Sequence, residues 1–180
     1  MGSDPKTQAK EVVIRPMGDD ADFVALTAMI HRAYKQLADM GLKYWATHQP
    51  VEDTKKRAEG GETWFAEHEG RVIGTVTLAP PNLGGERGWN TPAWYSRPGV
   101  ATFGQFAVEP EFQRSGIGSR LMEHIEGRAR KLGAAELSMD TSEHAHHLIV
   151  YYQNRGYRVV GEADWRPKVN YKSVILSKTL

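Results

Sequence analysis

The sequence predicts a mixed α/β domain in which one central sheet carries helices on both of its faces. Short β-rich runs alternate with segments of helical periodicity, an order typical of layered sheet-and-helix folds. Glycine and proline stand between these runs, where turns are needed. The chain has 180 residues, 40% of them hydrophobic, which suffices for one domain with its own core. We assign residues 11–180 to this single domain and the polar residues 1–10 to a disordered N-terminal segment.

The composition excludes several classes of function. The formal net charge is +1, so no large basic surface for nucleic acid is expected. The chain has no cysteine, which excludes disulfide scaffolds, thiolate metal sites and cysteine nucleophiles. No apolar run approaches the length of a membrane span, and the N-terminus lacks the apolar core of a signal peptide. We expect a cytoplasmic protein with neither a membrane nor a nucleic-acid partner.

The first half of the chain predicts a strand, two helices and a β-hairpin. Phe23, Leu26 and Ile30 repeat at helical spacing, whereas the β-rich runs on either side of the helices are short. The pair Glu69-Gly70 is typical of a tight hairpin turn. The expected elements are a strand at 11–17, a helix that begins at Asp19 or Asp20 and ends at Gly41, a second helix at 51–58, and strands at 63–67 and 72–78.

The second half predicts four strands, two helices and one long loop, which brings the sheet to about seven strands. The loop, residues 80–98, carries Trp89, Trp94 and Tyr95. A loop of this length either serves function, for example by lining an acceptor pocket, or packs over the core; the sequence leaves both open. The expected elements are strands at 99–108 and 134–141, a helix that opens near 115–118, a helix within 146–157, and an antiparallel pair at 157–165 and 171–178.

A glycine-rich turn, residues 113–118, precedes the first of these helices. Unpaired backbone N–H groups at a helix N-terminus bind phosphate, and glycines let a bulky anion approach them. A Walker-type loop would need Gly-Lys-Ser/Thr, but Ser119-Arg120 follows Gly118. A dinucleotide fingerprint would need its first glycine directly after the strand, but residues 109–115 intervene. The turn therefore predicts either a pyrophosphate cradle of another kind or a tight entry turn without a ligand.

Two motifs resemble the GCN5-related N-acetyltransferase (GNAT) superfamily. Gln113-Arg114-Ser115-Gly116-Ile117-Gly118 matches its Gln/Arg-x-x-Gly-x-Gly/Ala signature, after the lead-in "FAVEPEFQ". "YYQNRGY" is similar to the family's Tyr-x-x-x-Gly-Phe/Tyr ending of a later helix. Together the motifs span roughly residues 102–157. The resemblance implies a GNAT-like mixed sheet with helices on both faces and acetyl-CoA as the donor.

The resemblance also implies the residues that hold the donor. In the family, backbone N–H groups of the signature turn bind the pyrophosphate, and the pantetheine arm pairs with the end of the preceding strand. The implied cofactor-binding residues are Phe106, Ala107, Val108, Gln113, Arg114, Ser115, Gly116, Ile117, Gly118 and Ser119. The N–H of Val108 is then expected to polarise the thioester carbonyl.

Tyr152 stands where the family often has a tyrosine that acts as general acid toward the departing CoA thiolate. A tyrosine is protonated at neutral pH and can donate to such a thiolate. The alternative is core packing, because Tyr151 and Tyr152 are adjacent and one of them must face the core. We expect Tyr152 to be catalytic.

The chain departs from the family pattern around the general base. Ala145 stands where many members have an asparagine that contacts the cofactor, and Gly104-Gln105 where some have acidic residues. The remaining candidates for the base are Glu109, Asp140, Glu143 and His144, or a relayed water. His144, His146 and His147 lack the i, i+4 spacing of a helical ligand pair with a partner, so we expect no metal.

From these observations we expect an N-acyltransferase that moves an acetyl group from acetyl-CoA to a primary amine by direct attack in a ternary complex. The acceptor would be the amine of a small molecule or a peptide, and the resemblance raises a homodimer as the assembly. Two alternatives stay open. One is a CoA-binding regulatory or vestigial module without catalysis. The other is a toxin-type acetyltransferase acting on aminoacyl-tRNA, although the net charge argues against a basic acceptor face.

Overall fold

The computed structural model describes residues 11–82 and 91–180, and within them one mixed sheet has seven strands in the order β1-β2-β3-β4-β5-β7-β6. Neighbouring strands are antiparallel except β4 and β5, which run parallel. The strands are β1 Val13–Pro16, β2 Glu62–His68, β3 Arg71–Ala79, β4 Val100–Val108, β5 Glu136–Ser142, β6 Arg158–Ala163 and β7 Ser173–Thr179. The segment 1–10 expected to be disordered, and Trp89, lie outside the described residues.

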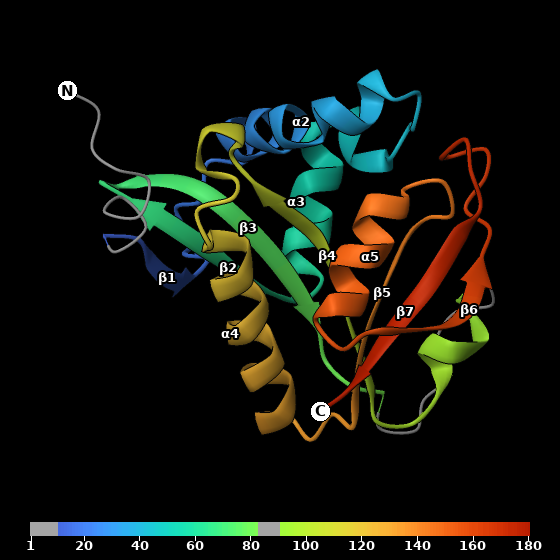
Figure 1. Cartoon of the computed structure of the whole chain (residues 1–180). Coiled ribbons are helices and arrows are strands. Elements are labelled where there is room, and N and C mark those ends of the chain that lie inside the picture. The colour runs from blue at the N-terminus through green and yellow to red at the C-terminus, as the bar shows by residue number, and fades with distance from the viewer. Residues whose placement is uncertain (1–10, 83–90) are drawn as a thin grey trace.

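In the described part of the chain, four α-helices cover the two faces of the sheet. They are α2 Phe23–Asp39, α3 Val51–Glu59, α4 Ile117–Lys131 and α5 His146–Asn154. In Figure 1, α2 and α3 lie on one face, and α4 and α5 lie on the other. Ile30 of α2 shares one buried cluster with Phe65 of β2, while Leu121 and Tyr152 share the larger cluster on the opposite face. The predicted fold class and order of elements are confirmed.

The first helix begins later than predicted. Asp22, rather than Asp19 or Asp20, is the N-cap, and its Oδ1 accepts a hydrogen bond from the N–H of Ala25 at 2.9 Å. Such a cap satisfies one of the N–H groups that a helix start leaves unpaired. The end is as expected, because Gly41 takes a left-handed φ of 81°, which glycine adopts without strain.

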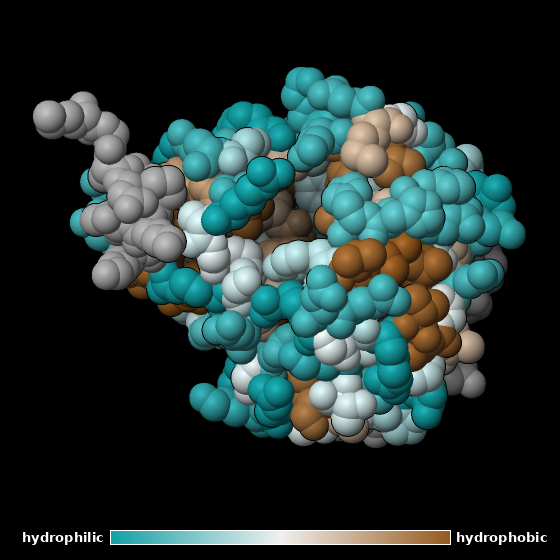
Figure 2. Space-filling view, in the orientation of Figure 1, coloured by the Kyte–Doolittle hydropathy of each residue, from teal (hydrophilic) through white to brown (hydrophobic). Residues whose placement is uncertain are grey.

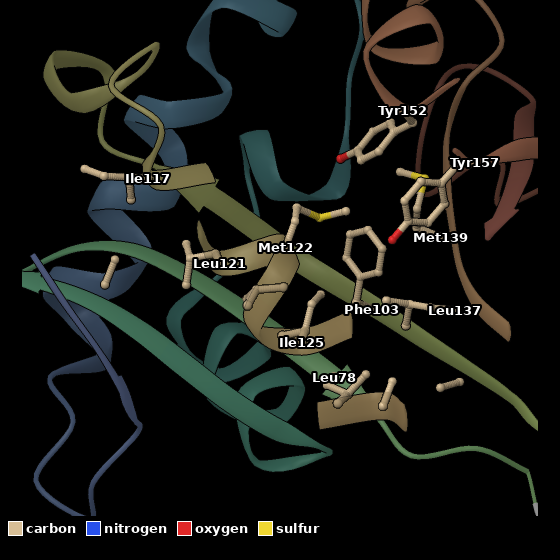
Figure 3. Close-up of a cluster of buried hydrophobic side chains, with 14 of the residues drawn as sticks. Leu78, Phe103, Ile117, Leu121, Met122, Ile125, Leu137, Met139, Tyr152 and Tyr157 are labelled. Atoms are coloured by element: carbon tan, nitrogen blue, oxygen red, sulfur yellow. The ribbon is translucent and has the colours of Figure 1, made fainter. Parts of the chain in front are cut away.

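The helix after the glycine-rich turn packs on the sheet through one apolar stripe. Leu121, Met122 and Ile125 are fully buried, and Figure 3 shows them facing Leu78 and Leu137 from the strands. Fully burying a side chain of this kind contributes roughly 1.5–3 kcal/mol of stability. The stripe therefore fixes where the N-terminus of α4 stands relative to the sheet.

Strand β4 changes the face of its side chains in mid-strand. Phe103 packs in the cluster under α4, whereas Ala107, an even number of residues later, packs under α2. Gln105 between them has a left-handed φ of 49°, and the register with β3 shifts nearby. One extra residue in a strand reverses the alternation. Phe106 consequently joins Phe103 on the α4 face, with ring centroids 6.2 Å apart.

Strand β4 also separates from β5. Their parallel pairing runs from Val100 to Thr102 on β4 and stops there, whereas β5 is paired with β7 over its whole length. β4 likewise stays paired with β3 up to Val108, so the sheet opens between β4 and β5, which diverge beyond Thr102 (Figure 1). The functional site forms at this divergence.

No helix in residues 11–82 or 91–180 is long and apolar enough to cross a membrane.

Candidate active site

A cavity of about 790 Å³ lies where β4 and β5 diverge. Its walls come from α2, β4, β5 and α5, from Arg57 of α3, and from residues 44–46 and 165–171, which are far apart in the sequence. Figure 2 shows a hollow on this side of the molecule, with hydrophobic residues in its depth and hydrophilic residues at its rim. The size suits a small-molecule site, since such sites usually measure roughly 300–1,000 Å³.

One wall of the cavity is the open edge of β4. The N–H of Glu109 donates to the carbonyl of Ile73 in β3 at 2.8 Å, and backbone groups of a strand point alternately to its two sides. Val108 therefore presents its N–H and C=O to the side of β5, where the strand pairing has ended. Its carbonyl accepts from Gln113 Nε2 at 3.1 Å, and that of Phe106 accepts from the Tyr34 hydroxyl at 2.9 Å. A ligand with amide groups can pair with such an edge.

The glycine-rich turn forms a row of unpaired backbone N–H groups at the end of this edge. Arg114 and Gly116 have left-handed φ values of 62° and 88°, and α4 begins directly afterwards at Ile117. Within the described residues, the amides from Arg114 to Ser119 have no hydrogen-bond acceptor, and the N-cap Gly116 offers no side chain. Alternating backbone conformations followed by a helix N-terminus form an anion-binding concavity.

The side chains of the turn divide into two groups. Gln113, Arg114 and Gly118 line the cavity. The Ser115 hydroxyl donates to the carbonyl of Phe112, the Ser119 hydroxyl accepts from Arg155 at 3.0 Å, and the Ile117 side chain is fully buried. The side chains of Ser115, Ile117 and Ser119 are thus already engaged or buried, and only their backbone N–H groups are free to bind an anion.

Tyr152 enters the cavity from α5. Its side chain is 6% exposed, and within the described residues its hydroxyl has no hydrogen-bond partner, although it lines the cavity. In Figure 3 the hydroxyl points away from Tyr157 and out of the hydrophobic cluster. Burial raises its pKa well above the usual value of a tyrosine, so the hydroxyl stays protonated at neutral pH. Tyr151 is the more exposed of the pair, at 37%.

Of the four candidates for the base, the structure brings Asp140 to the cavity and not the others. Glu109 is buried between Arg32 and Arg71, at 2.7 and 3.1 Å, and the hydrogen bond from Arg32 lowers its pKa. A carboxylate held in this way is a weak base. Glu143 and His144 lie outside the cavity lining, 3.6 Å from one another.

The described part of the long loop packs against the Asp140 carboxylate on the side away from the cavity. Tyr95 is buried and its hydroxyl donates to Asp140 Oδ1 at 2.8 Å, while Trp165 Nε1 donates to Oδ2 at 2.9 Å. Trp94 Nε1 donates to the Ser138 hydroxyl at 2.9 Å. Neither Trp94 nor Tyr95 lines the cavity. In the described residues, the loop therefore supports the site from behind by packing and hydrogen bonding.

Several residues of the cavity were not predicted from the sequence. Tyr44 lies between Tyr34 and Tyr171, with ring centroids 5.6 and 4.9 Å apart, and its hydroxyl contacts Thr141 Oγ1 at 2.6 Å. Arg57 reaches the cavity from α3, a helix that the sequence marks only as polar. The aromatic residues carried a weak signal, because helical spacing placed Tyr34 on the buried stripe of α2. No sequence pattern distinguished Arg57 from its charged neighbours.

The one cluster of possible metal ligands among the described residues lies outside the cavity. It consists of Glu11, His68 and Glu69 at the surface near the β2–β3 turn. The three histidines considered from the sequence do not form such a cluster there.

The chain matches the family model "Acetyltransferase (GNAT) family" over residues 27–157. Among curated proteins it is 27% identical over 150 residues to an S-(2-succino)cysteine N-acetyltransferase of Bacillus subtilis, covering 81% of this chain and 84% of that protein. It is 23% identical over 146 residues to an S-alkylcysteine N-acetyltransferase of the same organism, covering 79% and 77%.

Solved structures have the same fold. A GNAT family acetyltransferase from Elizabethkingia anophelis with acetyl-CoA bound aligns with a TM-score of 0.61 at 17% identity, covering 94% of this chain and 99% of that one. The ribosomal-protein-S18-alanine N-acetyltransferase from Escherichia coli aligns with a TM-score of 0.67 at 16% identity, covering 93% of each chain.

Proposed function

Since the chain belongs to the acetyltransferase (GNAT) family and takes its acetyl group from acetyl-CoA, we propose that it acetylates the primary amine of a small molecule held in the cavity between β4 and β5. One observation carries this proposal: the open edge of β4, the unpaired amides at the start of α4 and the free hydroxyl of Tyr152 all meet around one cavity. These three features match the amides, the pyrophosphate and the leaving sulfur of one acetyl-CoA molecule.

The donor is bound mainly by backbone groups. The N–H groups from Arg114 to Ser119 hold the pyrophosphate, and the Arg114 side chain adds a positive charge. The pantetheine arm continues along Phe106 to Val108, as an additional strand on the open edge of β4. Gln113 links the turn to the end of β4, because its side-chain amide donates to the Val108 carbonyl.

The reaction is a direct transfer within one ternary complex. The neutral amine attacks the thioester carbonyl, a C–N bond forms, and the C–S bond breaks to release CoA as a thiolate. The N–H of Val108 stabilises the negative charge that develops on the carbonyl oxygen. The proton that the amine loses leaves through Asp140, a carboxylate that lines the cavity, or through solvent.

Tyr152 acts on the leaving sulfur by donating a hydrogen bond. A thiol has a pKa of about 8.5, whereas burial raises that of Tyr152 well above 10. The tyrosine is therefore the weaker acid, and donation to the developing thiolate is its main contribution before the thiolate takes up its proton. Its raised pKa keeps the donor in place over the whole neutral range.

A small acceptor fits the site better than the alternatives considered from the sequence. The names of both Bacillus subtilis relatives specify cysteine derivatives as acceptors, which are small molecules with a primary amine. A free phenolic donor beside the open edge supports catalysis over a module that only binds CoA. The net charge of +1 gives no support to an aminoacyl-tRNA acceptor.

The test is an acetyl-transfer assay. Purified protein is mixed with acetyl-CoA and a panel of amino acids, polyamines, aryl-alkylamines and peptides, and both free thiol and acetylated product are measured. The expected result is stoichiometric thiol and N-acetyl product with at least one small amine. CoA should also raise the melting temperature, while NAD and ATP should raise it far less. Binding of CoA without transfer to any amine would favour the regulatory module instead.

A further inference from the structure

Arg57 brings a positive charge into the cavity from α3. Its side chain is half-buried and lines the cavity together with Gly104 and Gln105 of β4. The same three residues line an adjoining hollow of about 170 Å³. Arg57 Nη2 lies 3.5 Å from the point where a Cβ on Gly104 would stand. A Cβ at this position would be in ordinary van der Waals contact with the guanidinium, so Arg57 lies directly beside the backbone of β4.

A buried network of neutral groups holds the guanidinium in place. Arg57 Nη1 donates to Gln49 Oε1 at 2.7 Å, and Gln49 is fully buried. Gln49 Nε2 in turn donates to Gln105 Oε1 at 2.9 Å and to the Thr54 hydroxyl at 2.7 Å. The position of the arginine is therefore fixed through β4, the strand that also carries the donor site.

None of these partners compensates the charge of the arginine. Among residues 11–82 and 91–180, no carboxylate lies within ion-pair distance of Arg57. Burial lowers its pKa, and Tyr34, Asp140, Asp53 and Tyr171 act in the opposite direction. An arginine keeps its charge under such conditions. A half-buried guanidinium with one hydrogen bond retains donors that match a planar oxyanion, above all a carboxylate.

The cavity also carries the complementary charge. Asp140 lines the same cavity, and its two structural hydrogen bonds leave further acceptor sites on the carboxylate. The rings of Tyr34, Tyr44 and Tyr171 line the same cavity and offer an apolar surface with few hydrogen-bond donors. One cation, one anion and an aromatic wall in a single cavity are complementary to a zwitterion with an apolar side chain.

We propose that Arg57 binds the carboxylate of the acceptor, so that the acceptor is an α-amino acid with an apolar side chain. This inference rests on the proposed acetyl transfer to a small amine. The carboxylate lies on the guanidinium, and the amino group lies toward Asp140 and the thioester. The apolar side chain packs on Tyr44 and Tyr171. Arg57 then decides between an amino acid and the corresponding amine without a carboxylate.

The first test uses the unmodified enzyme and matched acceptors. S-Methyl-L-cysteine, L-methionine, L-phenylalanine and L-leucine are each compared with their methyl ester and with the amine that lacks the carboxylate. We expect kcat/KM for at least one amino acid to exceed that for both matched compounds by about 10–100-fold, because a hydrogen-bonded charge pair is lost in each of them. Equal or faster transfer to the amines overturns the role of Arg57 and leaves the proposed acetyltransferase activity standing. No transfer to any amine overturns both.

The second test asks whether the Arg57 side chain causes the preference for the amino acid over the amine. Arg57→Gln should raise KM for the amino acid about 10–100-fold and leave transfer to the matched amine unchanged, and Arg57→Lys should recover part of the loss. The control is Arg128→Gln, which removes an equal charge from an ion pair with Glu62 outside the cavity and should affect neither acceptor. The KM for acetyl-CoA should stay the same in all three variants. Equal losses for amino acid and amine would assign Arg57 a structural role and overturn the inference.

Discussion

Replacing Tyr152 by phenylalanine isolates the hydroxyl, because the aromatic ring and its packing remain. The ring lies in the cluster with Phe103 and Tyr157, at centroid distances of 6.3 and 5.8 Å. Within the described residues, the hydroxyl has no hydrogen-bond partner, so its removal orphans no other polar group. We therefore expect the melting temperature of Tyr152→Phe to stay the same or to rise slightly.

The expected loss is in kcat, and its size follows from the state of the hydroxyl. General-acid catalysis contributes about 10²–10⁴-fold, whereas a hydrogen bond to a charged group contributes about 1.5–3 kcal/mol, or roughly 10–150-fold. Because burial makes Tyr152 a weaker acid than a thiol, the hydrogen bond should dominate, and we expect a loss of about 10²-fold. The KM for acetyl-CoA should change little, since the turn at the start of α4 and the edge of β4 are untouched.

The assay is single-turnover release of CoA thiol at saturating acceptor, which reports the chemical step. Tyr157→Phe is the matched control, because Tyr157 is buried beside Tyr152 but lies outside the cavity lining and donates to Glu126 Oε1 at 3.2 Å. That variant should lose stability and keep its rate. Tyr151→Phe is not a suitable control, since Tyr151 lines the cavity near Gly118. If Tyr152→Phe keeps nearly full kcat in this assay, Tyr152 is a packing residue and our reasoning is wrong.

Three further outcomes follow from the structure. Gly118→Ala should fold normally, because a Cβ there has only ordinary contacts, the nearest at 3.5 Å from Phe106, yet CoA titration by calorimetry should show weaker binding; unchanged affinity would make the glycine a turn residue only. Glu109→Gln should lower the melting temperature at neutral pH. Its hydrogen bond from Arg32 lowers the pKa, so this stabilisation is present above about pH 4.5 and is lost as the pH falls through the folded value; a variant as stable as the wild type at pH 7 would contradict this. Burial raises the pKa of Tyr34 to about 12, so folding favours the protonated hydroxyl. Its contribution to the free energy of unfolding is fully present below pH 10 and is lost as the pH rises from 10 to 12. Between pH 10 and 12 the urea midpoint of Tyr34→Phe should fall less steeply than that of the wild type. If the two midpoints fall in parallel, the raised pKa of Tyr34 is refuted.

The order of the elements and the glycine-rich turn before α4 were predictable because both are local in the sequence. Periodicity and glycine placement fix the turn at residues 113–118 and the helix after it, and the structure adds only which amides are free. The exact start of α2 was missed, since Asp19, Asp20 and Asp22 are equally good caps by residue type.

The acceptor side was not predictable, because it depends on contacts between distant segments. Arg57 stands in a short polar helix, and only the fold brings that helix against Gln105 through Gln49. Asp140 was one of four equal candidates, and it alone among them lines the cavity. The sequence cannot show which charged residues line the cavity, because burial is a property of the tertiary structure.

The reversal of side-chain direction in β4 lies next to both the proposed donor side and the proposed acceptor side of the site. Phe103 and Phe106 are three residues apart yet lie on one face, a spacing that a regular strand with a period of two cannot give. The irregular residue is Gln105, whose left-handed φ turns its side chain to the network that holds Arg57. The pairing of β4 with β5 has ended before Gln105, so the backbone of Phe106 and Val108, where we propose that the donor binds, is not covered by β5. Gln105 therefore stands beside both proposed binding sites, and we expect changes at Gln105 to weaken the binding of acetyl-CoA and of the acceptor together, whereas changes at Arg57 should weaken only that of the acceptor.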